Sequence, residues 1–167
     1  SYPMAYKGRD RQKSSERILH PLKGDAERAE RLRDLIDELA GINSTEHGDV
    51  PVIVEGKRDK AALITLGLTG KIITYNQGLG VHDFCEQIAE TYNEVMLLMD
   101  WDREGNALQQ KLGRELAGQC EEFKRFRETL ILMCQKEIKD VEGIPALLRR
   151  LEAGMVEETL IEPEDNK

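Results

Sequence analysis

The stretch Val95-Met96-Leu97-Leu98-Met99-Asp100-Trp101-Asp102-Arg103-Glu104-Gly105 decides the fold. Its apolar run ends abruptly in two carboxylates one residue apart, and a helix-compatible segment follows at once. A short apolar run bounded by charge is typical of a strand buried on both faces of a parallel sheet. In open α/β sheets, ligands bind beyond the carboxyl ends of the strands. Asp100 and Asp102 are therefore predicted to stand where a ligand binds.

These two carboxylates are suited to holding one hard cation. In an extended chain, residues i and i+2 point to the same side, about 6–7 Å apart at Cα. Mg2+ favours oxygen ligands and is often held by one or two carboxylates together with substrate phosphate. We therefore expect Mg2+, with Mn2+ as a substitute. The alternative is structural: Asp102 would cap the helix that begins near Arg103, and Glu104 would lie in its first turn, where negative charge is favoured.

A second short strand ends in the same way. Residues 50–54 are apolar and rich in valine, Glu55 follows them directly, and Gly56 leads into a helix-compatible segment. Gly56 allows either a tight turn or the close approach of a ligand. Lys57 and Lys60 lie near the start of the following helix, which is itself an anion site, so they are candidate phosphate contacts. An ordinary strand-to-helix turn explains the lysines, but it explains a glutamate at this position less well.

Further segments complete an α/β pattern. We expect strands over residues 50–54, 71–75, 95–99 and, weakly, 119–124, and helices over residues 25–40, 81–92, 104–117 and around 126–134. Asn76 and Gly78 follow the strand at 71–75, in a loop that we place beside the site. The pattern of short apolar strands alternating with helices predicts a mainly parallel sheet.

The composition limits the classes of function. The chain has 167 residues, 40% of them hydrophobic, which suits one compact domain with extensions. Its net charge of −8 means that the surface as a whole repels nucleic acid, so any such contact must be local or bridged by metal. Three cysteines without a C-x-x-C pair predict reduced thiols in a cytoplasmic protein. No stretch is long and apolar enough for a membrane span, so we expect no membrane partner.

The two strand ends together resemble the Toprim domain, the catalytic domain shared by topoisomerases, bacterial-type primases and several nucleases. Ile53-Val54-Glu55-Gly56-Lys57 resembles its first motif. Asp100-Trp101-Asp102-Arg103-Glu104-Gly105 resembles the Asp-x-Asp-Arg-Glu-Gly motif of type IA topoisomerases, except that Trp101 stands where those enzymes usually have proline. Val54-Glu55-Gly56-Lys57-Arg58-Asp59 is similar to the maturase ribonucleases of ribosomal RNA. The whole chain looks most like the small stand-alone Toprim proteins of archaea.

This resemblance implies a compact, Rossmann-like α/β fold, with helices on both faces of a mainly parallel sheet and flanking N- and C-terminal helices. It implies that Glu55 acts as a general acid or base in phosphodiester chemistry and also contributes to the metal site. Asp100 and Asp102 would hold Mg2+, with Glu104 as a further carboxylate. The candidate substrate contacts are Gly56, Lys57, Lys60, Asn76, Gly78, Arg103 and Lys139.

The chain divides into five expected segments. They are a basic, mobile arm at residues 1–24, an N-terminal helix and loop at 25–49, the Toprim domain at 50–143, a C-terminal helix at 144–156 and an acidic, disordered tail at 157–167. Lysines and arginines outnumber acidic residues in the arm. The arm is compatible with a phosphate-contacting tail, although its composition slightly favours a solvated leader.

Two hypotheses of function follow. The first is a Mg2+-dependent phosphodiester enzyme, above all a nuclease of the RNA-processing or DNA-repair type. The second is a non-catalytic module that binds nucleic acid or a ribonucleoprotein through the metal site and the arm. Glu55 favours the enzyme, because metal binding alone needs no proton-transfer group. The lack of a broad basic face favours a partner protein that presents the RNA or DNA.

Overall fold

The structure is a computed structural model that describes residues 24–75 and 77–153. A three-stranded parallel sheet lies at its centre, with the strand order β2-β1-β3. The strands are β1 (Val52–Val54), β2 (Ile72–Thr74) and β3 (Met96–Leu97). The predicted parallel sheet is therefore present. The arm before residue 24, Asn76 and the tail at 157–167 lie outside the described residues.

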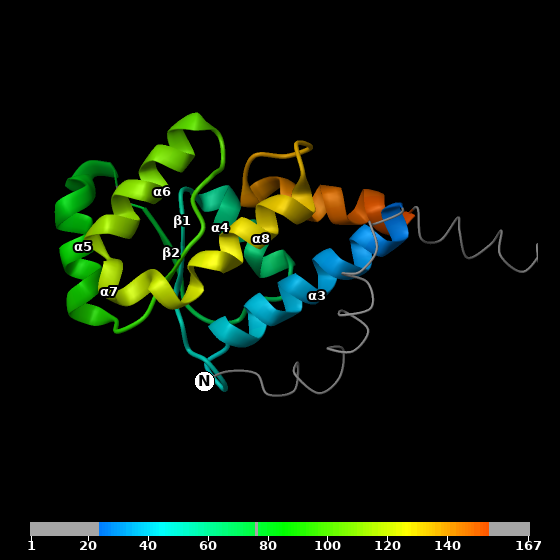
Figure 1. Ribbon diagram of the computed structural model, residues 1–167. Helices are drawn as coiled ribbons and strands as arrows, with labels where there is room; N and C mark the ends of the chain where they lie inside the picture. The colour runs from blue at the N-terminus through cyan, green and yellow to red at the C-terminus, as the bar shows by residue number, and fades with distance from the viewer. Residues whose placement is uncertain (1–23, 76, 154–167) are drawn as a thin grey trace, which may run out of the picture.

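Helices cover both faces of this sheet. They are α3 (Asp25–Asn43), α4 (Lys57–Thr65), α5 (Gly80–Thr91), α6 (Arg103–Glu115), α7 (Ala117–Cys120) and α8 (Lys124–Cys134), with 3-10 turns η1 (Gln77–Leu79), η2 (Glu121–Phe123) and η3 (Val141–Gly143). A further helical segment spans residues 144–153. Figure 1 shows α5 and α6 on one side of the strands and α3, α4 and α8 on the other. The expected α/β architecture with flanking terminal helices is confirmed.

Alternate residues of each strand pack into two separate cores. Val52 and Val54 of β1 belong to the core shared with α3, α4, α8 and the last helical segment. Ile53 and Leu97 belong to the core shared with α5 and α6. Burying one such side chain fully stabilises the fold by about 1.5–3 kcal/mol. Burial on both faces explains why these strands are continuous apolar runs rather than alternating ones.

The order in which strands are added to the sheet reverses at β1, because β2 lies on one side of β1 and β3 on the other. The connection from β1 to β2 runs through α4 on the first face, and the connection from β2 to β3 runs through α5 on the second. The end of β1 is thus a topological switch point, where open α/β sheets form a crevice. Glu55 lies directly after β1, at this crevice.

The weak strand predicted at residues 119–124 is wrong, because that segment forms α7 and η2. The segment keeps one backbone bond beside β3, from the Val95 N–H to the Gln119 carbonyl at 3.0 Å, and side chains bond the groups further along. Gln109 accepts a hydrogen bond from the Met99 N–H at 3.1 Å and donates to the Leu97 carbonyl at 3.2 Å. Arg127 Nε donates to the Met99 carbonyl at 3.0 Å. These bonds remove the need for a fourth strand at this edge.

Helix α3 runs beyond its predicted end at residue 40 and finishes at Asn43. Asn43 was expected in a polar loop, but its side chain is fully buried. Its Nδ2 donates to the carbonyls of Val50 and Lys71, each at 2.9 Å, and its Oδ1 accepts from the Gly70 N–H at 2.8 Å. Asn43 therefore fastens the end of α3 to the starts of β1 and β2.

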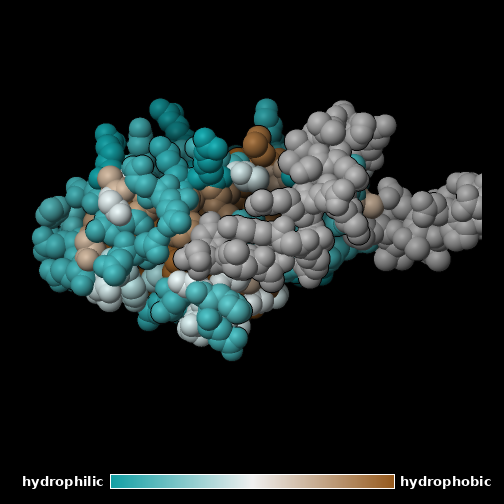
Figure 2. All heavy atoms as spheres, turned by 60° about the horizontal axis from the view of Figure 1, so that its bottom comes forward, coloured by the Kyte–Doolittle hydropathy of each residue, from teal (hydrophilic) through white to brown (hydrophobic). Residues whose placement is uncertain are grey.

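The surface over α5, α6 and α7 is mostly hydrophilic on the face drawn in Figure 2. None of the helices in the described part of the chain is long and apolar enough to span a membrane. Cys85, Cys120 and Cys134 are free thiols, and Cys85 and Cys134 are buried. The prediction of unpaired cysteines is thus confirmed.

Candidate metal centre

Glu55 and Asp100 form an acidic pair at the carboxyl ends of two adjacent parallel strands. Their carboxyl groups lie close enough to share a proton in a hydrogen bond, and the Asp100 backbone also acts on the Glu55 carboxyl group. Burial raises the pKa of Asp100 to about 7, with further increases from the charge of Glu55 and from the hydrogen bond between them. Burial also raises the pKa of Glu55, although the bonds from Asp100 oppose this. The pair is therefore able to hold a proton near neutral pH.

The acidic pair also fits a divalent cation. Asp100 Oδ1 is buried and has no hydrogen-bond partner among the described residues. A buried polar atom without a partner is costly, and a bound cation would relieve that cost. The available donors are carboxylate oxygens, which Mg2+ and Mn2+ prefer. Glu55 and Asp100 would hold such an ion from two different strands.

Asp102 fulfils the structural role that was the alternative to metal binding. Its Oδ1 accepts a hydrogen bond from the Gly105 N–H at 2.7 Å and caps α6. The cap occupies one oxygen only. The charge of Asp102 raises the pKa of Glu55, so it lies within electrostatic range of the acidic pair. Capping and metal binding are thus compatible, while Glu104 lies exposed in the first turn of α6.

Gly105 lets α6 pack directly against the end of the β3 segment. A Cβ at this position would lie 2.2 Å from the Asp100 carbonyl oxygen, which is far inside van der Waals contact. The helix start and Asp100 therefore fit together only with glycine here. The sequence motif contained Gly105, but this steric reason becomes visible only in the fold.

A second cluster of carboxylates was missed by the sequence analysis. One oxygen each of Asp59, Asp140 and Glu142 lies within 4.8 Å of the others, close enough to share a metal ion. The charges of Asp59 and Asp140 raise the pKa of Asp100, so this cluster adjoins the acidic pair. The sequence analysis assigned neither Asp140 nor Glu142 to a site. Their distance along the chain from Asp59 left no signal that they meet it.

Asp59 already has strong backbone partners. It is buried, and its two oxygens accept hydrogen bonds from the Gly56 N–H at 3.1 Å and the Glu142 N–H at 3.0 Å. These bonds connect the first turn of α4 to η3. Asp59 therefore holds the Glu55 loop and the 140–143 turn in fixed relative positions.

Trp101 fastens the same turn from the other side. Its backbone N–H donates to the Lys139 carbonyl at 2.8 Å, and its Nε1 donates to the Ile138 carbonyl at 2.9 Å. Proline, which topoisomerases usually have here, could make neither bond because it has no N–H. The departure from the topoisomerase motif thus places Lys139 and Asp140 beside the metal centre.

A tight turn does not explain the glycine at position 56. Its backbone is extended, with φ −143°, and an added Cβ would meet only Asp59 Oδ2 at an ordinary 3.8 Å. Other residues could adopt this conformation. Of the two reasons offered for Gly56, close approach of a ligand is the one that the geometry leaves.

The remaining candidate substrate contacts stay predictions, and the structure gives only their positions. Lys57 and Lys60 are exposed on the first turn of α4, and Arg103 is exposed at the start of α6. Gly78 is exposed in η1, on the loop expected beside the site. Asn76 lies outside the described residues.

Comparisons with known proteins agree with the motifs. A family model described as the Toprim domain matches residues 50–129. A UPF0292 protein of Methanosarcina barkeri is 38% identical over 130 residues, which cover 74% of this chain and 85% of that protein. A UPF0292 protein of Thermococcus onnurineus is 37% identical over 123 residues, covering 73% and 86%. A solved structure of a protein from Aquifex aeolicus aligns over 70% of this chain and 94% of its own, with 24% identity and a TM-score of 0.44.

Proposed function

The chain belongs to the UPF0292 family and contains a Toprim domain, and on that premise we propose that it is a Mg2+-dependent enzyme that cleaves phosphodiester bonds in RNA or DNA. Toprim membership points to metal-dependent chemistry related to nucleic acids. The observation that carries the finer proposal is the acidic pair, Glu55 and Asp100. It lies at a topological switch point and contains a buried carboxylate oxygen without a partner.

The residues of the chain divide the chemistry between them. Asp100 and Asp102 would hold Mg2+, with Glu55 completing the ligand set. The bound ion supplies charge neutralisation at the scissile phosphate. Glu55, whose pKa is raised by burial, moves a proton between water and the leaving oxygen. Gly56 leaves room for the phosphate, and the exposed Lys57 and Lys60 contact it.

The acidic surface determines which partners the proposal includes. A chain of net charge −8 gains little general attraction for nucleic acid. We therefore include a partner protein that presents the substrate, and a cytoplasmic location in keeping with the free thiols. A non-catalytic metal-dependent binding module is the alternative outcome of the experiment below.

Glu55→Gln tests the catalytic role. It keeps the shape of the side chain but removes proton transfer, so turnover of RNA or DNA should fall by about 10²–10⁴-fold. Metal binding through Asp100 and Asp102, followed by the emission of Trp101, which is the single tryptophan, should persist with reduced affinity. Glu90→Gln, an exposed change on α5, serves as the matched control and should behave as wild type.

The assay uses structured RNA and DNA with Mg2+ or Mn2+. Cleavage that survives intact in Glu55→Gln would remove Glu55 from the catalytic role. Metal-dependent strand binding by the wild type without any turnover would favour the binding module instead.

A further inference from the structure

A cavity of about 520 Å³ lies between α6 and α8, beside the outer edge of β3. Leu97 and Phe123 contribute apolar surface to it. Arg127 and Asn106 also line it and lie nearest to the metal centre, because Arg127 Nη2 donates to the Asp100 carbonyl at 2.7 Å and to Asn106 Oδ1 at 2.8 Å. The cavity therefore begins directly behind Asp100. We call it the α6–α8 groove.

The walls of the α6–α8 groove combine polar groups with a somewhat larger apolar surface, and their charged side chains have a positive excess of one. Side-chain amides come from Asn106, Gln109 and Gln110, positive charges from Arg114, Lys124 and Arg127, and negative charges from Glu121 and Glu128. A local positive excess contrasts with the net charge of −8 of the whole chain. Arg114 lies two turns beyond Asn106 on α6, about 12 Å of helix rise. Positive side chains thus line both walls, with Arg114 on α6 and Lys124 and Arg127 on α8.

We propose that the α6–α8 groove binds the single-stranded segment of nucleic acid that leads away from the scissile phosphate, with Arg114 and Lys124 contacting its phosphates. This inference rests on the proposed function and names the form of its substrate. A positive groove that follows the backbone is how proteins bind single strands. The amide of Gln110 is suited to hydrogen bonds with base edges, whereas Gln109 and Asn106 already bond to groups of the protein.

The size of the groove argues against a duplex. Cavities of about 300–1,000 Å³ hold ligands of small-molecule size. A double helix is far larger, since its major groove alone is about 12 Å wide. A duplex substrate would therefore have to open before its strand entered.

The first test removes the two charges that would bind phosphate. Arg114→Gln/Lys124→Gln is compared with Lys111→Gln/Arg125→Gln, which makes the same charge change at exposed positions of the same two helices outside the groove lining. Binding of a fluorescent single-stranded oligonucleotide, and of its duplex, is measured by anisotropy over a range of salt, with Ca2+ replacing Mg2+ to limit cleavage. The groove variant should lose at least tenfold in single-strand affinity. Its salt slope should fall by about 1.4, because two phosphates are no longer neutralised.

The second test fills the groove without changing charge. Gly113 lines it, and a Cβ there would meet nothing within 4 Å. Gly113→Leu should therefore fold, obstruct the groove and weaken single-strand binding. Gly118→Leu is the matched control, because its Cβ also meets nothing within 4 Å and Gly118 does not line the groove.

An assay with a small phosphodiester distinguishes a failure of this inference from a failure of the proposed function. Bis(p-nitrophenyl) phosphate has no strand to occupy the groove, so both groove variants should hydrolyse it with Mn2+ at the wild-type rate. Equal strand binding by groove and control variants would overturn the groove assignment and leave the metal-centre chemistry standing. Equal duplex and single-strand affinity, lost together, would overturn the single-strand assignment. A wild type inactive on every phosphodiester would sink the proposed function, while the binding comparison would still decide the groove.

Discussion

Gly105 shows at the scale of one residue how tightly the metal centre is built into the fold. Replacing it with alanine would place a Cβ 2.2 Å from the Asp100 carbonyl oxygen. The helix start or Asp100 must then move, at a cost of about 1–3 kcal/mol for such overpacking. That cost exceeds the gain of about 1 kcal/mol in helix propensity. Gly105→Ala should therefore destabilise the protein and weaken Mn2+ binding.

Gly113→Ala is the control for this prediction. It lies in the same helix, and its Cβ would meet nothing within 4 Å, so alanine should stabilise by up to about 1 kcal/mol. Thermal unfolding and calorimetric Mn2+ titration compare the two variants. Unchanged stability and Mn2+ affinity in Gly105→Ala would mean that Asp100 does not need its present position.

Site residues that directly follow a strand were predicted better than residues that reach the site by other contacts of the fold. Glu55 and Asp100 were found because each directly follows an apolar strand, and parallel neighbours end at the same edge. Asp140 and Glu142 were not, since they follow no strand and join the site through Trp101 and Asp59. The hydrogen bonds that position these two residues use backbone groups on the 138–142 segment. Every residue type has such groups, so the sequence gives no sign of these bonds.

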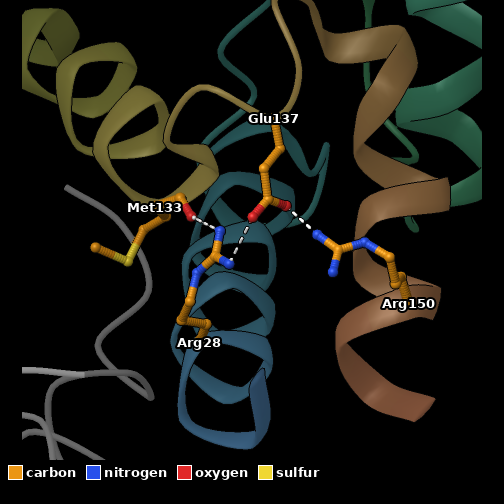
Figure 3. A network of polar contacts seen from close by, with 4 residues as sticks. All are labelled: Arg28, Met133, Glu137 and Arg150. Carbon is orange, nitrogen blue, oxygen red and sulfur yellow. Dashed lines mark hydrogen bonds and ion pairs between the residues drawn. The ribbon is translucent and has the colours of Figure 1, made fainter. Parts of the chain in front are cut away.

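At the scale of elements, Glu137 joins the two helices that flank the domain. Arg28 on α3 donates to Glu137 Oε1 at 3.0 Å and to the Met133 carbonyl at 3.1 Å, while Arg150, in the segment 144–153, reaches the other Glu137 oxygen (Figure 3). Burial alone would raise the Glu137 pKa, but these two arginines lower it below its ordinary value. Glu137 is partly exposed, which limits the net contribution of the network to about 1 kcal/mol.

Glu137→Gln should therefore destabilise the protein in a pH-dependent way. A lowered pKa means that the stabilisation is present in full above about pH 4.5, the ordinary value, and is lost as the pH falls through the folded-state value. In urea unfolding at pH 7 the wild type should be more stable than the variant by about 1 kcal/mol, and this difference should shrink as the pH is lowered below 4.5. A difference of constant size from pH 7 to pH 3 would show that charge is not its source.

Element boundaries in the sequence failed where side chains replaced backbone pairing. The weak strand predicted at 119–124 would have paired with a neighbouring strand through its backbone. Gln109 and Arg127 supply those hydrogen bonds instead, and this left the segment free to form α7 and η2. Because no fourth strand of the described residues lies along β3, there is space there for the α6–α8 groove. Apolar runs thus predicted the strands, whereas the polar side chains near β3 determined that no strand in the described part of the chain pairs with its outer edge.

At the scale of the whole molecule, the negative net charge opposes general binding of nucleic acid. The chain carries a net charge of −8, and three carboxylates, those of Asp59, Asp140 and Glu142, gather beside the candidate metal centre. The residues before Asp25 are the exception, with six lysines and arginines against two acidic residues. Attraction for a long substrate must then come from this arm, from bound metal and from the positive excess in the α6–α8 groove.

Removing residues 1–24 tests the contribution of the arm. If Lys7, Arg9, Arg11 and Lys13 contact phosphate, the truncated protein should bind RNA or DNA more weakly. Its salt slope should fall by about 0.7 for each single-strand phosphate that the arm no longer neutralises. Mn2+ binding and hydrolysis of bis(p-nitrophenyl) phosphate should persist, because the metal centre is built from residues 55–142. Replacing the four basic residues with glutamine in the full-length chain should reproduce the weaker binding if charge is its cause. Equal affinity and equal salt slope in wild type and truncation would make the arm a passive leader.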